Sequence, residues 1–125
     1  MSKKIFVVFG HHNTSTSFNA AIRDTFVEEA VSCGHDVDLV NLFEETEKLP
    51  FYNGEINPVP KLVVDYQKRL DNCDIMLLIG SCHNLRLNSI LENWIDWVLH
   101  PPWFFNYRSS LTRAGSFFLT AARNL

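Results

Sequence analysis

The chain has 125 residues, about the usual size of one domain, so we expect residues 1–125 to form a single domain and not two. Hydrophobic residues make up 46% of the chain and charged residues 20%, a composition typical of a globular protein that argues against disorder. The net charge of −3 gives no electrostatic reason to expect nucleic acid as a partner.

The N-terminus and the cysteines indicate where the protein resides. Only five apolar residues, 5–9, follow the polar start of the chain, which is too short a run for a signal peptide or a membrane span. The three cysteines are widely spaced and form no C-x-x-C pair, as is typical of reduced thiols inside a cell. We therefore expect a cytoplasmic protein with no membrane partner.

Strands and helices are predicted to alternate from the start of the chain. The unbroken apolar run 5–9 predicts a strand that is buried on both faces. Apolar residues then recur at every fourth position from Phe18, which predicts a helix with Ser17 as its N-cap and Gly34 at its end. Alternating polar and apolar residues over 36–42 predict a second, more exposed strand.

The same alternation continues through the second half of the chain. Residues 44–60 contain three prolines and predict a surface excursion, followed by an amphipathic helix from Leu62 to about residue 72. The apolar run 75–79 predicts a third strand, and the periodic pattern 90–99 predicts a third helix that ends before two prolines. A last strand is expected at residues 116–119.

This alternation predicts an α/β fold with right-handed crossovers and a doubly wound parallel sheet. Such sheets bind ligands beyond the carboxyl ends of their strands, where the strand order reverses. In the flavodoxin-like order 2-1-3-4-5, that point lies between the first and third strands. We therefore expect the loops 10–17 and 80–88 to face each other across one crevice.

The first of these loops carries four hydroxyl residues in a row, residues 14–17, directly before the predicted helix. Backbone N–H groups at a helix N-terminus, the helix dipole and short hydroxyl donors together favour phosphate binding. The loop has neither a G-x-G-x-x-G pattern nor a Walker lysine, so a dinucleotide fingerprint and an NTPase loop are not supported. A plain helix-capping turn is the alternative interpretation.

The second loop would place Cys82 and His83 opposite His11 and His12. Three imidazoles and a thiol have the chemistry of a zinc site, and Cys82 with a neighbouring histidine has the chemistry of a nucleophile and its base. No pair of ligands lies at a fixed helical spacing, so we expect no metal. We favour the interpretation that these side chains line a pocket or donate to phosphate oxygens.

Two motifs resemble a known family. Residues 4–9 are followed by H-x-x-x-x-S-F-N over residues 12–19, and L-x-x-W-I-D-x-V over residues 91–98 precedes F-F-N-Y at residues 104–107. In this order and spacing, the pattern resembles the flavodoxin-like NAD(P)H:quinone oxidoreductases, the group that contains DT-diaphorase and the bacterial modulator-of-drug-activity proteins. The similarity extends from about Lys4 to Thr120.

The resemblance implies a flavodoxin-like three-layer sandwich and a flavin, FAD or FMN, whose phosphates lie over the first loop. NAD(P)H is the implied electron donor, and a small quinone-like acceptor is reduced by two-electron hydride transfer. The family's enzymes usually form homodimers, and Trp103–Tyr107 would suit the interface. No catalytic residue is assigned. The expected cofactor-binding residues are His11, His12, Thr16, Ser17, Phe18, Asn19, Ser81, Cys82, His83, Asn84, Leu85 and Thr120.

The chain departs from this family in two places. After the third strand the family has P-x-W-W-x-x-x-P, where residues 81–88 contain neither prolines nor aromatic residues. Of the family's T-T-G-G after the fourth strand only Thr120 remains, and the fifth strand and its helix are missing, so we expect about four strands in the order 2-1-3-4. The alternative is a catalytically degenerate flavodoxin-like domain that binds a phosphate-bearing ligand or a protein partner.

Overall fold

The computed structural model describes residues 2–54 and 59–99 of the chain. Its elements in chain order are β1 (Lys4–Gly10), α1 (Phe18–Ser32), β2 (Asp36–Asn41), α2 (Lys61–Asp71), β3 (Ile75–Gly80), β4 (Cys82–His83), β5 (Arg86–Leu87) and α3 (Ser89–Val98). None of the helices among these residues is long and apolar enough to cross a membrane. The last predicted strand, residues 116–119, lies outside the described part of the chain.

Three parallel strands form the sheet in the order β2-β1-β3, which confirms the predicted order for these strands. Every residue of the central strand β1 from Ile5 onward is buried, because both faces and both edges of that strand are covered. β2 alternates exposed and partly buried residues, as its sequence predicted. The fourth strand of the predicted order falls on residues that the structure does not describe.

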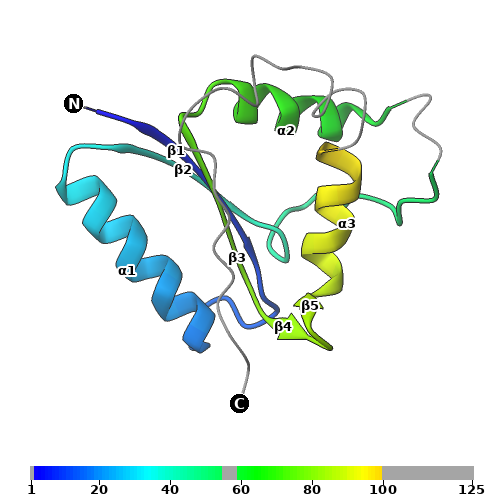
Figure 1. Cartoon of the computed structure of the whole chain (residues 1–125), viewed down its shortest axis with the longest axis horizontal. Helices are drawn as coiled ribbons and strands as arrows, with labels where there is room; N and C mark the ends of the chain where they lie inside the picture. Colours follow the sequence, from blue (N-terminus) through cyan, green and yellow to red (C-terminus); the bar gives the residue numbers. More distant parts are fainter. Residues whose placement is uncertain (1, 55–58, 100–125) are drawn as a thin grey trace.

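Helices cover both faces of the sheet and make the predicted three-layer sandwich (Figure 1). α1 lies on one face, and α2 and α3 lie on the other. Successive residues of β1 point to opposite faces, so each layer has its own core. The core under α1 contains Ile5, Val7, Phe9, Ala20, Ala30, Leu77 and Ile79. The core under α2 and α3 contains Phe6, Val8, Val40, Leu42, Val63, Tyr66, Met76, Leu78, Leu91, Trp94, Trp97, Val98 and Leu99.

Two local features differ from the sequence prediction. The apolar stripe of α1 was expected to begin at Phe18, but Phe18 is 66% exposed and the buried residues of the helix are Asn19, Ala20, Arg23 and Ala30. The rest of the predicted stripe is confirmed, because Ala30 lies in the core under α1 and Ile22 and Phe26 pack against it. The buried Arg23 guanidinium lies over the Phe9 ring, 4.5 Å from its centroid. Residues 80–88 were expected to form a loop, but they contain the antiparallel pair β4–β5.

Candidate functional site

The ends of β1 and β3 bring the two predicted loops together (Figure 1). Gly10 and Gly80 are register partners, so both loops leave the sheet at the same level. Asn19 Nδ2 donates to Ser81 Oγ at 3.2 Å, and Asn88 Nδ2 donates to the Gly10 carbonyl oxygen. Segments about 60 to 80 residues apart in sequence are therefore joined by two side-chain hydrogen bonds.

Asn13 organises the first loop. Its Oδ1 atom accepts hydrogen bonds from the backbone N–H groups of Ser15 at 3.2 Å and Thr16 at 2.9 Å. The Asn13 backbone carbonyl accepts from the Ser17 hydroxyl at 2.7 Å, and the Asn13 N–H donates to His11 Nδ1 at 3.0 Å. Two consecutive amide donors of the loop thus converge on a single oxygen atom.

The N-terminus of α1 adjoins this loop. Ser17 is the N-cap, as predicted, and its Oγ atom accepts from the Ala20 N–H at 3.0 Å. The first turn of α1 contains no acidic residue, so the positive end of the helix dipole is not offset by a carboxylate there. Asn19 is fully buried in this turn, and among the described residues its Oδ1 atom has no hydrogen-bond partner.

The two histidines of the loop have different surroundings. His11 is 3% exposed, whereas His12 is exposed, and the two rings stack with centroids 4.5 Å apart. The His12 ring also lies near the Phe43 ring, with centroids 6.4 Å apart and an angle of 81° between the ring planes. His11 therefore contributes to the structure of the loop, and His12 is the imidazole that a ligand can reach.

The second loop is a hairpin with a strained tip. Its two turn residues, Asn84 and Leu85, have φ angles of 50° and 65°. Positive φ at both positions matches the twist of paired strands, and asparagine tolerates it, but leucine rarely does. Leu85 is 99% exposed, so the hairpin holds an apolar side chain in solvent. Ser81 at its base is buried, and Cys82 is partly buried.

The remaining candidate residues are not brought into this arrangement by the described part of the structure. Thr120 and Trp103–Tyr107 lie outside the described residues, and the side chain of His83 is not described. Within residues 2–54 and 59–99, no three His, Cys, Asp or Glu side chains gather closely enough to hold a metal ion.

Two residues that shape the site were not predicted from the sequence. Asn13 lies in a run of turn-forming residues, and the tendency of asparagine to bond neighbouring backbone N–H groups was the available signal. Asn88 precedes α3 in the manner of an N-cap, but its side chain makes no capping bond and donates instead to Gly10. That contact depends on tertiary structure and has no local signal.

Known proteins with this fold are numerous. A family model described as flavodoxin-like fold matches residues 3–121, and no curated protein sequence matches the chain. Structurally, the chain is similar to an NAD(P)H:quinone oxidoreductase from Methanothermobacter marburgensis, with a TM-score of 0.77 and 18% identity over 98% of this chain and 66% of that protein.

Two further structures extend the comparison. FerB, a flavoenzyme NAD(P)H:(acceptor) oxidoreductase from Paracoccus denitrificans, gives a TM-score of 0.68 and 20% identity over 94% of this chain and 60% of its own. Smu.1420 from Streptococcus mutans gives a TM-score of 0.67 and 17% identity over 95% and 87% of the two chains. The chain thus spans less than two-thirds of the length of both oxidoreductases.

Proposed function

Because the chain belongs to the flavodoxin-like fold family, as its motifs predicted, we propose that it is a flavin-dependent oxidoreductase that uses NAD(P)H to reduce a quinone-like acceptor. The observation that carries this proposal is the convergence of amide and hydroxyl donors at the start of α1, beside the end of β3. Two structurally similar proteins named as NAD(P)H oxidoreductases support the same class of reaction.

The phosphate-bearing part of a flavin fits the first loop. The N–H groups of Ser15 and Thr16 already converge on one oxygen atom, that of the Asn13 side chain, and a phosphate oxygen has the charge to replace it. The Thr16 hydroxyl, which donates to Asn13 Oδ1, adds a donor once a phosphate oxygen replaces that atom, whereas the Ser17 hydroxyl donates to the Asn13 backbone carbonyl. His12 lies exposed at the rim, and no carboxylate in the first turn of α1 opposes an anion.

The flavin ring, FAD or FMN, is assigned to the hairpin after β3. Its apolar contact there is Leu85, which is fully accessible, while Ser81, Cys82 and the His83 backbone below the tip, and Asn84 in the turn, supply backbone and polar groups. When bound, the flavin supplies the two-electron redox chemistry, and the protein orients it and the acceptor. Thr120 is proposed to complete the contact, on the strength of its family motif.

The assembly and location are proposed from the sequence. The aromatic residues Trp103–Tyr107 would form the interface of a homodimer, since so many rings cannot all be buried by one small domain. The widely spaced cysteines support a cytoplasmic protein, and the length of 125 residues supports one domain over residues 1–125.

One observation favours a second candidate, a degenerate domain that binds a phosphate-bearing ligand without catalysis. Where the family resemblance leads one to expect paired aromatic residues for stacking, the described side chains of the hairpin include the exposed Leu85 but no Phe, Tyr or Trp. An aliphatic side chain packs against a flavin ring but lacks the π-face of an aromatic partner. Loss of the redox reaction with retention of phosphate binding would follow from this difference.

Titration with FMN and with FAD, followed by flavin fluorescence and absorbance, tests the proposal. We expect saturable binding of one flavin that Thr16→Val weakens about tenfold, because the substitution removes the Thr16 hydroxyl, which bonds the Asn13 side chain and would donate to a charged phosphate. Thr25→Val, at an exposed position in the middle of α1, is the matched control. Absence of flavin binding by the unmodified chain would contradict the proposal.

NAD(P)H oxidation with menadione as acceptor then separates the two candidates. Turnover that depends on added flavin supports the oxidoreductase. Flavin binding with turnover at background supports the degenerate domain, because the phosphate contacts at the first loop would be intact while the hairpin fails to support the reaction.

A further inference from the structure

An uncharged surface pocket lies between the first half of α3 and the segment that follows β2. Its volume is about 230 Å³, which suits a ligand group of one or two rings, since pockets for drug-sized ligands hold roughly 300–1,000 Å³. None of its described lining residues is charged, so a neutral group fits it better than a phosphate or a carboxylate. The lining residues are Phe43, Leu49, Phe51, Ser89, Ile90 and Asn93.

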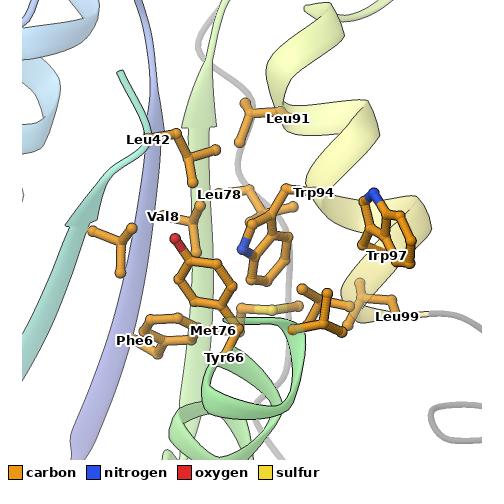
Figure 2. Close-up of a cluster of buried hydrophobic side chains, with 13 residues drawn as sticks. Phe6, Val8, Leu42, Tyr66, Met76, Leu78, Leu91, Trp94, Trp97 and Leu99 are labelled. Atoms are coloured by element: carbon orange, nitrogen blue, oxygen red, sulfur yellow. The ribbon is translucent and has the colours of Figure 1, made fainter. Parts of the chain in front are cut away.

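Phe51 is held at the rim of this pocket by hydrogen bonds on both sides of it. The Asn93 side chain accepts from the Tyr52 N–H at 2.8 Å and donates to the Pro50 carbonyl at 3.0 Å. Trp97 Nε1–H donates to the same carbonyl at 2.8 Å, and Figure 2 shows Trp97 at the edge of the core cluster under α3. Phe51 itself is 87% exposed. The backbone therefore fixes this residue in solvent before a ligand arrives, which lowers the entropic cost of binding to it.

The pocket adjoins the first loop, to which the flavin phosphates are assigned. Phe43 is 43% exposed, and its ring centroid lies 6.4 Å from that of His12 in this loop. Ile90 packs against Gly10, the last residue of β1, because a Cβ atom placed there would lie 3.1 Å from Ile90 Cγ2. A ligand whose phosphates lie on the first loop can therefore extend a ring into this pocket.

The strand order aligns the pocket with the other two parts of the proposed flavin site. The strands are parallel in the order β2-β1-β3, so their carboxyl ends lie side by side, about 4.8 Å apart from one strand to the next. The segment after β2, the first loop after β1 and the hairpin after β3 follow one another along this edge. FAD consists of adenosine, a pyrophosphate and the ribityl-isoalloxazine in the same order, whereas FMN lacks the adenosine.

We propose that this pocket binds the adenine of FAD, so that FAD and not FMN is the cofactor. The inference rests on the proposed flavin-dependent function. Adenine is a neutral group of two fused rings, and bases stack on exposed aromatic side chains such as Phe43 and Phe51. The Ser89 hydroxyl, and the Asn93 N–H that remains after the bond to Pro50, supply polar groups for the nitrogen atoms of the base.

Calorimetric titration of the full chain with FAD and with FMN tests this proposal. FAD is expected to bind at least tenfold more tightly, because FMN leaves the pocket empty and the stacking of one base corresponds to about a tenfold gain in affinity or more. Adenosine, which carries no phosphate for the first loop, is expected to compete with FAD and not with FMN.

A substitution at the rim of the pocket makes the test specific. Phe51→Ser is expected to lower the affinity for FAD about tenfold and to leave the affinity for FMN unchanged. Because Phe51 is 87% exposed, its replacement leaves the core intact. Val64→Ser, at an exposed apolar position on α2, is the matched control and is expected to change neither affinity.

The possible failures can be told apart. Equal affinities for FAD and FMN, or an equal loss of both in Phe51→Ser, would overturn this proposal and leave the proposed function intact. So would a raised KM for NADH in Phe51→Ser with an unchanged affinity for FAD, because the pocket would then belong to the adenine of the electron donor. Failure of both flavins to bind would contradict the proposed function itself, and this inference with it.

Discussion

Asparagine side chains hold the loops around the ends of β1 and β3. Asn13 fixes the first loop, and Asn19 and Asn88 each connect that end of the sheet to a distant segment. An amide group both donates and accepts, so one side chain can bridge two backbone segments. Among the described residues, Asn19 and Asn88 each retain an Oδ1 atom without a partner, which leaves two buried acceptors where the loops meet.

Leu85 carries the clearest backbone strain at this scale, with a φ of 65°. We expect Leu85→Gly to be more stable than Leu85→Ala by about 1 kcal/mol, because both substitutions remove the side chain but only glycine adopts positive φ without a steric penalty. Urea unfolding of the two variants measures the difference. Equal stabilities would mean that the turn relaxes to negative φ at this residue.

α1 depends on its N-cap, Ser17, which directly precedes the first residue of the helix. Ser17 Oγ accepts from the Ala20 N–H, so Ser17→Ala is expected to lower the free energy of unfolding by about 1 kcal/mol. Ser15→Ala is the control, because Ser15 is exposed and its bond to Asn13 uses the backbone N–H and not the hydroxyl. The midpoints of urea unfolding of the two variants are compared. An equal loss of stability in both variants would show that the Ser17 hydroxyl makes no specific cap.

The first strands and helices were predictable at the element scale, since their apolar residues repeat with the period of the structure they form. β1 is an unbroken apolar run, and the pattern of α3 matches its buried residues Leu91, Trp94, Trp97 and Val98. The hairpin β4–β5 was not predictable in this way. Each of its strands has two residues, which is too few to establish a period.

The two cores on either side of one sheet hold the described part of the molecule together, and Leu91 of α3 packs against a pair of glycines at the ends of β1 and β3. An ideal Cβ atom on Gly10 would lie 2.6 Å from Leu91 Cγ, and one on Gly80 would overlap the same leucine even more. These two positions have no room for a side chain, because Leu91 fills the space in front of both strands.

This contact can be measured by a double-mutant cycle. Gly80→Ala is expected to lower the free energy of unfolding by about 1–3 kcal/mol through overpacking. In a Leu91→Ala background the same substitution should cost less, with a coupling of about 0.5–3 kcal/mol, because the shortened side chain leaves room for the methyl group. Additive effects in chemical denaturation would show that Leu91 does not pack on Gly80.

By itself, the sequence determined the alternation of strands and helices, the Ser17 cap and the strand order that follows from the family motifs. The alternation and the cap are local, because periodicity and capping depend on residues a few positions apart. It also indicated that residues 10–17 and 80–88 would meet, through the general topology of parallel sheets.

Only the tertiary structure decided which side chains join residues 10–17 to residues 80–88. It also decided which buried polar atoms have no partner among the described residues. The bonds of Asn19 to Ser81 and of Asn88 to Gly10 span 62 and 78 residues. Among the described residues the Trp94 N–H has no partner, because packing against Tyr66 and Phe6 buries it in the core, and no sequence period predicts this contact. Hydrogen bonds and cavities of this kind arise from the fit between layers, and so they appear only once the layers are assembled.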